Sequence, residues 1–278
     1  MISVINYDDK RTGSNLQTHK GFKVLNSDLT SYVIEMTNSQ SIEQLWGMHV
    51  QKMKSYGFDR IIYGFTHFST PKGFGDPDDF ILLTNLNSEY VDVFVHEGLF
   101  LDAPMTNWAF ENEGVSSWGI VEDLVKTGSL SAGELRAIEF NKKHGAICGY
   151  TISFKALSTR SRGAIGLVGQ HGLTQDDVDD IWARHGEELV LINNVAHLKI
   201  LSLPYTTMSG RKLTKRQREA LEWVADGKTA QQIALLMGLT VATVEKHLRL
   251  ARESLGVETT AQAVLKAAFQ NQMFVVDR

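Results

Sequence analysis

Apolar residues along this chain switch between helical spacing and strict alternation, and each switch predicts a change of secondary structure. In residues 41–57 the apolar residues recur at helical intervals, and Ser41 stands three residues before a glutamine, as in a capping box. This segment therefore predicts one helix. Alternation over residues 59–68 and a short apolar run at 80–83 predict two strands, joined by a loop rich in Gly and Pro. Residues 1–30 show neither period, so we expect a loosely held arm there.

The middle of the chain repeats this change from helical to alternating spacing. Pro104 suits the first turn of one helix, and a capping box at Ser131 predicts another that reaches about His144. Residues 150–169 then form two alternating segments around a polar turn, which is the pattern of a β-hairpin. The longest helix is expected over residues 174–201, with one apolar face for its own sheet and a second for another subunit. This order predicts an α+β domain, with a mostly antiparallel sheet between layers of helices (α-β-α).

Residues 213–255 return to helical spacing and are divided into three successive helices. Thr214 and Thr229 each stand three residues before a glutamine, as in a capping box, and Gly227 can end the first helix in a left-handed turn. Thr240 can cap the third helix, which has one apolar face and one polar, charged face. Such a helix fits a DNA major groove, so we predict an all-α helix-turn-helix domain rather than a bundle with incidental charges.

The polar face of the third helix supplies the candidate contacts to DNA. Glu245 and Arg249 are four residues apart and project from one side, where Arg can pair with guanine and Glu can accept from cytosine N4. The lysines and threonines around them are expected to bind phosphate. The candidate DNA-binding residues are Lys228, Thr229, Thr240, Thr243, Glu245, Lys246, Arg249 and Arg252.

Composition adds a domain division and a charge asymmetry to this picture. The 278 residues, 43% hydrophobic and 22% charged, are typical of a globular chain with two domains. We expect an arm at 1–30, a body at 31–201, a linker at 202–210 and the DNA-binding domain at 211–278. Residues 205–278 hold 11 Lys and Arg against 7 Asp and Glu, or +4, so the overall charge of −4 leaves −8 elsewhere. A basic tail on an acidic body favours DNA as the partner of the tail.

Several kinds of chemistry have no support in the sequence. Cys148 is the one cysteine, which excludes an internal disulfide and a cysteine-rich zinc finger. The histidines lack metal-ligand spacing, and we expect Asp76, Asp78 and Asp79 to be solvated in their Gly/Pro loop, so no metal or other cofactor is expected. No nucleophile elbow or phosphate-binding loop indicates an enzyme. The lack of a signal peptide or a long apolar run favours the cytoplasm, without membrane contact.

The tail domain resembles the LuxR-type DNA-binding domain. The following residues fall, in order and spacing, where that family has its signature: Leu213, Thr214, Arg216, Leu221, Trp223, Gly227, Lys228, Thr229, Ile233, Ala234, Thr243, Val244 and His247. The family usually has Glu where Gln217 and Gln232 stand, and often a basic residue where Glu245 stands. The resemblance implies DNA binding, while Glu245 indicates that the bases read differ from those of its relatives.

Residues 85–152 resemble the acyl-homoserine-lactone (autoinducer-binding) sensor domain of LuxR-type quorum-sensing regulators. Two departures remove polar groups: Phe94 stands where a tyrosine is usual, and Ala103 where an aspartate normally accepts the ligand's amide N–H. Asp102, one residue earlier, is the carboxylate that can replace it. The candidate ligand-binding residues, of which Pro104, Trp118 and Gly149 match the family and Tyr90 replaces a tryptophan, are Tyr90, Phe94, Asp102, Ala103, Pro104, Trp118 and Gly149.

The resemblance implies a transcriptional regulator that binds promoter DNA as a homodimer and contacts RNA polymerase. Because an unpaired buried polar group costs about 1 to 3 kcal/mol, we expect the pocket to take a small, apolar, non-lactone ligand or to be filled by its own aromatic side chains. A long-chain lactone remains an alternative, since burying each CH₂ contributes roughly 0.8 kcal/mol. Two others are a phosphorylation-controlled response regulator and a body that serves only for dimerisation.

The expected homodimer has two joints. One is the helix over 174–201, and the other is a fourth helix of the tail domain behind a capping box at Thr259. That helix carries a face of small residues suited to close packing, made of Ala263, Val264, Ala267 and Ala268. We expect two reading helices about 34 to 36 Å apart, one turn of DNA.

Overall fold

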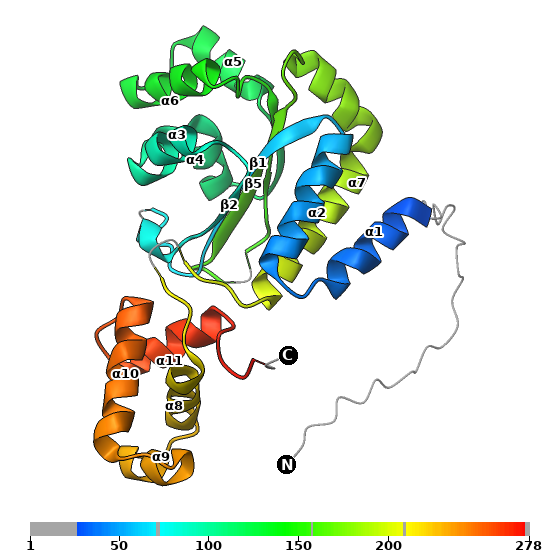
Figure 1. Ribbon diagram of the computed structural model, residues 1–278. Helices are drawn as coiled ribbons and strands as arrows, with labels where there is room; N and C mark the ends of the chain where they lie inside the picture. Colours follow the sequence, from blue (N-terminus) through cyan, green and yellow to red (C-terminus); the bar gives the residue numbers. More distant parts are fainter. Residues whose placement is uncertain (1–26, 71–72, 157, 208–209, 276–278) are drawn as a thin grey trace, which may run out of the picture.

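The structure, a computed structural model, describes residues 27–70, 73–156, 158–207 and 210–275, which form a sheet unit and a four-helix unit (Figure 1). The sheet unit contains α1 (Ser27–Asn38), α2 (Ile42–Ser55), β1 (Phe58–Thr66), η1 (Pro77–Asp79), β2 (Ile81–Thr84), α3 (Ser88–Val91), η2 (Asp92–His96), η3 (Leu99–Asp102), α4 (Pro104–Glu111), β3 (Gly114–Ser117), α5 (Gly119–Thr127), α6 (Ala132–Lys143), β4 (Gly149–Ser153), β5 (Arg162–Gly169) and α7 (Gln175–Ser202). The four-helix unit contains α8 (Lys215–Ala225), α9 (Ala230–Met237), α10 (Val241–Leu255) and α11 (Thr260–Phe269).

The strands form one antiparallel sheet in the order β2-β1-β5-β4-β3. This confirms the α+β domain with an antiparallel sheet, the β1 and β2 strands, and the β4–β5 hairpin. In the register, Tyr63 pairs with Ile165, and Ile165 pairs with Ile152. Because side chains alternate along a strand, these three residues share one face of the sheet, and Gly64 and Ala164 share the other.

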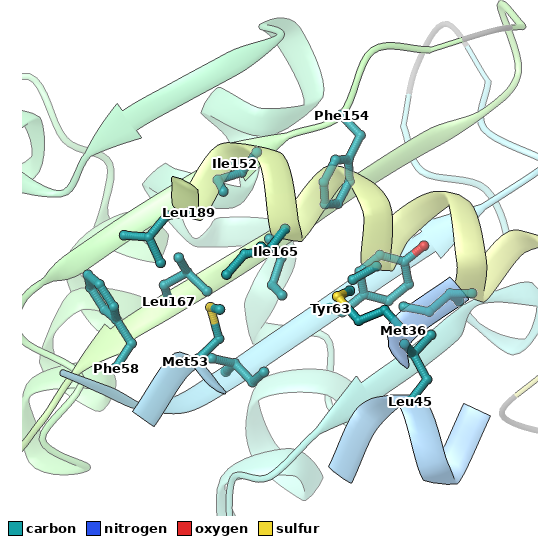
Figure 2. Packing of buried hydrophobic residues seen from close by; sticks show 14 of the residues in the cluster. Met36, Leu45, Met53, Phe58, Tyr63, Ile152, Phe154, Ile165, Leu167 and Leu189 are labelled. Carbon is teal, nitrogen blue, oxygen red and sulfur yellow. The ribbon is translucent and has the colours of Figure 1, made fainter. Parts of the chain in front are cut away.

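The face that carries Tyr63 is packed solidly under α2 and α7. Tyr63, Ile165 and Leu167 are at most 1% exposed, as are Met53 of α2 and Leu189 of α7. Figure 2 shows these side chains pointing toward one another between the strands and the helices. Full burial stabilises each such side chain by about 1.5 to 3 kcal/mol, so this packed face is the main core of the sheet unit.

Helix starts occur where the sequence places its caps. Ser131, Thr174, Thr214 and Thr229 each accept a hydrogen bond from a backbone N–H three residues later, and the residue at that position bonds back. Pro104 is the first residue of α4. These local signals are therefore confirmed as helix boundaries.

Three elements contradict the sequence-based expectations. Helix α1 begins at Ser27, inside the expected arm. Its apolar residues recur at helical spacing and pack on the core, a pattern that the prediction overlooked: Leu29, Tyr32, Val33 and Met36. Residues 1–26 of that arm lie outside the described part. Trp118 joins β3 to α5, two elements that were not predicted from the sequence. Strand β3 has four residues, too few to show a clear alternation. Helix α5 carries apolar residues on one face at helical spacing, a pattern that the prediction overlooked: Ile120, Val121, Leu124 and Val125.

The four-helix unit has its own core, built from one face of each helix. Leu221, Ile233 and Val244 are fully buried there, as are Ala263 and Ala267 of α11. The expected small-residue face for a second subunit is therefore wrong in part, because Ala263 and Ala267 pack inside their own bundle. The capping box that starts α11 is confirmed.

Helix α11 also contacts the sheet unit. The ring of Phe269 stacks on His67, just beyond β1, with centroids 4.5 Å apart and 16° between the planes. Lys266 forms an ion pair with Asp79, and the two side chains are 12% and 19% exposed. Asp79 is therefore not solvated as expected. Asn271 donates to the carbonyl of Leu201 at 2.7 Å. We call these interactions the α11 contact.

Candidate ligand cavity and DNA-binding face

A cavity of about 470 Å³ lies on the sheet face opposite the packed face. Its floor includes a group of small residues, namely Gly64 of β1 and Ala164 and Gly166 of β5, together with Thr151 of β4. A Cβ placed at Gly64 would meet nothing within 4 Å. Because these residues have no side chains that reach the covering helices, space remains where the other face is filled. The volume is in the range typical of sites for small molecules.

Aromatic rings form the wall opposite this floor. Phe80, Phe94 and Phe100 are less than 10% exposed and line the cavity. Phe94 lies 4.9 Å from the ring of Tyr90, and Phe80 lies 5.9 Å from that of Phe100. The rings pack on one another around the space instead of occupying it. Phe74 and Phe80 come from the segment before β2, which the sequence did not mark as part of a site.

Five of the seven predicted ligand-binding residues line the cavity: Tyr90, Phe94, Ala103, Pro104 and Trp118. Asp102 and Gly149 do not belong to the lining. A Cβ at position 149 would stand 2.1 Å from the carbonyl oxygen of Leu167 and 3.2 Å from the indole of Trp118. Gly149 thus allows β4 to approach β5 and leaves room for Trp118.

Asp102 lies at the end of η3, against α6. Its carboxylate accepts a hydrogen bond from Arg136 at 3.4 Å, and its side chain is 45% exposed. It also lies so close to Gly133 that a Cβ there would stand 2.7 Å from it. In the structure, Asp102 is therefore engaged on the outer side of Ala103, not in the cavity.

The polar side chains at the aromatic end of the cavity are bonded within the protein. The hydroxyl of Tyr90 donates to Asn141 at 2.7 Å, and burial raises the pKa of Tyr90, so the hydroxyl stays protonated. The indole N–H of Trp118 donates to the hydroxyl of Thr151 at 2.9 Å. Phe94 and Ala103 offer no side-chain hydrogen bond. Within the described lining, Glu122 on exposed α5 is the single carboxylate.

Charged residues in the lining are mostly cations. Arg162 begins β5 and is half-buried, and its guanidinium lies 5.6 Å from the ring of Phe110. Lys126 of α5 and Lys142 of α6 line a different part of the cavity and are exposed. Arg162 is not among the residues predicted from the sequence. The alternation of β5 was a usable signal, because Arg162 has the same parity as Ala164 and Gly166 on the cavity floor.

In the four-helix unit, α10 presents a polar face outside the core. Val244 and Leu248 are buried, whereas Glu245, Lys246 and Arg249 are exposed. This confirms the predicted division of the helix into an apolar and a polar face. The other candidate DNA-binding residues on the surface are Lys228, Thr229 and Thr240.

Several of the predicted DNA-binding residues already make contacts within the protein. Arg249 forms an ion pair with Glu253, one turn further along α10. Arg252 is half-buried and donates to the hydroxyl of Thr260 at 3.0 Å. The half-buried Thr243 donates its backbone N–H to the hydroxyl of Thr240 at 3.2 Å, which caps α10.

Neither a metal site nor a membrane span is found in the described part of the chain. No three His, Cys, Asp or Glu side chains of these residues are grouped so that they could hold a metal ion. None of the described helices is both long and apolar enough to cross a bilayer.

Comparison with known proteins agrees with the two units. Residues 41–200 match the family described as autoinducer binding domain, and residues 211–267 match the family described as bacterial regulatory proteins, luxR family. The transcriptional activator ExpR of Dickeya dadantii is 25% identical over 224 residues, which cover 77% of this chain and 84% of ExpR. The transcriptional activator LuxR of Aliivibrio fischeri is 23% identical over 194 residues, covering 68% and 73%.

Solved structures share the architecture. Escherichia coli SdiA superimposes with a TM-score of 0.52 at 17% identity, over 90% of this chain and 99% of SdiA. A second SdiA structure, in complex with octanoyl-rac-glycerol, gives a TM-score of 0.50 at 18% identity, over 90% and 97%. At this identity the likeness is one of fold.

Proposed function

This chain belongs to the LuxR-type family of quorum-sensing transcriptional regulators, and we propose that its cavity takes a largely apolar ligand other than an acyl-homoserine lactone. The observation that carries this proposal is the cavity of about 470 Å³ next to Ala103. Around Ala103 the described lining offers no carboxylate to accept an amide N–H, and Tyr90 and Trp118 are bonded to protein partners.

The polar groups of a lactone make its burial in this cavity unfavourable. An amide N–H and carbonyls buried without partners would cost about 1 to 3 kcal/mol each, or about tenfold or more in affinity. A long acyl chain offsets part of this cost, so a long-chain lactone is the second candidate. The open cavity favours a bound ligand over a pocket filled by its own rings. SdiA, which has this fold, was solved with an octanoyl glycerol, a ligand without a lactone ring.

Thermal-shift titration of the purified protein tests this proposal. We expect lactones of short and long chain to leave the melting temperature nearly unchanged at micromolar concentration, and Ala103→Asp to restore stabilisation by lactone because it supplies the amide acceptor. Gly64→Val is the matched blocking variant, since its side chain would enter the cavity without meeting protein atoms at the Cβ. Strong stabilisation of the unmutated protein by a lactone, lost in Gly64→Val, would contradict the non-lactone assignment.

We further propose that two copies of the four-helix unit read promoter DNA, with α10 in the major groove. Exposed Glu245 and Arg249 are one turn apart, in position to contact base edges, and Lys246 is in position to contact phosphate. On operator DNA obtained by in vitro selection, we expect Glu245→Ala to relax preference at one base pair. Lys246→Ala should weaken binding to all DNA sequences alike. It should also reduce the steepness of the plot of log affinity against log salt concentration by about 1. Equal losses on every sequence for both variants would contradict these roles.

The homodimer and the contact with RNA polymerase belong to the same proposal. Leu191 and Leu198 of α7 are 37% and 59% exposed on the side of the helix away from the sheet, which supports a second subunit there. Light scattering in the presence of operator DNA tests the assembly, with a dimer as the expected species at micromolar concentration. A monomer bound to DNA would contradict it. Transcription reconstituted with purified RNA polymerase tests the second contact.

A further inference from the structure

We infer that the ligand of the cavity is an elongated amphiphile with a carboxylate group, and that Arg162 binds that carboxylate. The inference rests on the proposed function, because it requires that the cavity be a ligand site. It adds the charge of the ligand, its orientation, and the residue that selects it.

The first observation is the surroundings of Arg162. One of its N–H groups donates to the carbonyl of Ser161 at 2.8 Å, and its guanidinium lies over the ring of Phe110. A guanidinium has five N–H donors, so this carbonyl occupies only part of them. Across the described residues, none of the ion pairs involves Arg162. The cation at the cavity wall is therefore not neutralised by a carboxylate of the described chain.

The second observation is the contrast with Arg60, another half-buried arginine of the same sheet. Arg60 pairs with Asp59 at 3.2 Å and donates to the carbonyls of His144, Gly145 and Gly169 at 2.8 to 3.1 Å. Arg60, a structural arginine, thus has both a counter-ion and several carbonyl acceptors. Arg162 has one neutral acceptor and no counter-ion in the described structure, so its remaining donors are available to a bound anion.

The third observation is the charge of the lining. Among the described residues of the lining, Arg162, Lys126 and Lys142 are cations, and Glu122 is the single carboxylate. The chain outside the DNA-binding tail carries −8, so this excess of positive charge is opposite in sign to the body around it. Such a local field attracts an anion to the cavity and repels it from the rest of the surface.

The shape of the cavity sets where the rest of the ligand lies. The lining follows β5 from Arg162 to Val168, which at about 3.3 Å per residue is about 20 Å. The glycine and alanine floor and the phenylalanine wall continue from Arg162 toward Trp118 and are apolar. A carboxylate matches the planar, two-pronged geometry of a guanidinium, and the apolar body then lies along the floor.

A matched pair of probes tests this inference: dodecanoate and 1-dodecanol, which share one chain and differ in charge. Calorimetric titration at neutral pH, below the concentrations at which the probes aggregate, should show dodecanoate binding about tenfold or more tightly than dodecanol. Arg162→Gln should remove this preference by weakening dodecanoate alone. Arg162→Lys should recover part of it, because the charge remains but the fork is lost. Gly64→Val should weaken both probes.

The outcomes separate the inference from the proposed function. Equal binding of both probes, unaffected by Arg162→Gln but weakened by Gly64→Val, overturns the carboxylate assignment and leaves the cavity as a ligand site. Binding of neither probe to the unmutated protein, or binding unaffected by Gly64→Val, overturns the inference and counts against the ligand role of the cavity. Retained dodecanol binding in Arg162→Gln also shows that this variant is folded, so a loss of dodecanoate cannot be ascribed to unfolding.

Discussion

The two faces of the central sheet are built from the same strands, but one is filled by side chains and the other leaves a cavity. On the packed face, Tyr63, Ile165 and Leu167 interlock with α2 and α7. On the cavity face, one residue along each strand, Gly64, Ala164 and Gly166 leave a floor of small residues. Alternation along a strand thus lets one segment stabilise the fold and form a binding site without conflict. Substitutions on the two faces should therefore affect different measurements.

The largest effect is expected on the packed face. Leu167 is fully buried, and Leu167→Ala removes apolar contacts and leaves a void, at a cost of about 2 to 5 kcal/mol in the free energy of unfolding. Urea denaturation followed by circular dichroism measures this loss. A cost as small as that of a surface substitution would mean that the packed face is not the core.

The second-largest effect is expected at acid pH, where protonation of buried histidines on the packed face should lower the free energy of unfolding. His49 is fully buried, and burial lowers the pKa of His49 to about 4; burial likewise lowers that of His197 to about 4. The unfolded chain binds a proton on each near pH 6.5. Stability is therefore complete above pH 6.5 and falls as the pH drops toward 4, by roughly 3 kcal/mol per histidine.

Unfolding free energies measured from pH 7 to 4.5 check this dependence. In His49→Gln, the slope of the free energy against pH should fall by about 1.4 kcal/mol per unit in the acid part of this window. The neutral glutamine keeps a group that can bond to Asn193, which lies 3.0 Å from the imidazole. An unchanged slope would show that His49 does not couple protonation to folding.

On the cavity face, a matched substitution should have a small effect of opposite sign. Gly64→Ala adds a methyl group where nothing lies within 4 Å and reduces the freedom of the unfolded chain. We expect the free energy of unfolding to rise by roughly 0.4 to 1 kcal/mol. A loss of several kcal/mol, like that of Leu167→Ala, would erase the distinction between the two faces.

Asp102→Ala should have the smallest effect on both measurements. The pair with Arg136 is largely exposed, and such pairs contribute about 0 to 1 kcal/mol. Because the carboxylate lies outside the lining, the affinity for any cavity ligand should change by less than about twofold, well under 1.4 kcal/mol. Titration of the variant with dodecanoate checks this, and a loss of tenfold would place Asp102 in the site.

The sequence predicted best what is decided locally. The caps at Thr214 and Thr229 depend on neighbours three residues away, and the packed strand β1 shows its alternation directly. The cavity is different, because its wall joins Phe80, Phe94 and Phe100 from separate short helices and turns. No periodicity records which of these segments meet, so the resemblance to a known family supplied Tyr90 and Trp118.

Arg162 shows which part of the site the sequence could not predict. A charged residue at the start of a strand is ordinarily solvated. The alternation of β5 puts Arg162 on the same face as Ala164 and Gly166, but nothing in the sequence shows that this face lines a cavity or that Phe110 lies beside it. The departure at Ala103 was visible in the sequence, whereas the position of Asp102 against Arg136 required the structure. The sequence alone does not determine whether the Asp102 carboxylate points into the cavity or toward Arg136.

The α11 contact joins the segment beside the cavity to the four-helix unit, so a thermodynamic cycle can relate ligand binding to DNA binding. Its Asp79 directly precedes Phe80 of the cavity wall, and its Phe269 and Lys266 belong to the helix that follows α10, the proposed DNA-reading helix. If an occupied cavity shifts the free energy of this contact by about 1.4 kcal/mol, and DNA binding requires that shift, affinity for DNA changes tenfold. Reciprocity then requires bound DNA to change the affinity for the ligand by the same factor, which makes the promoter an effector of the cavity.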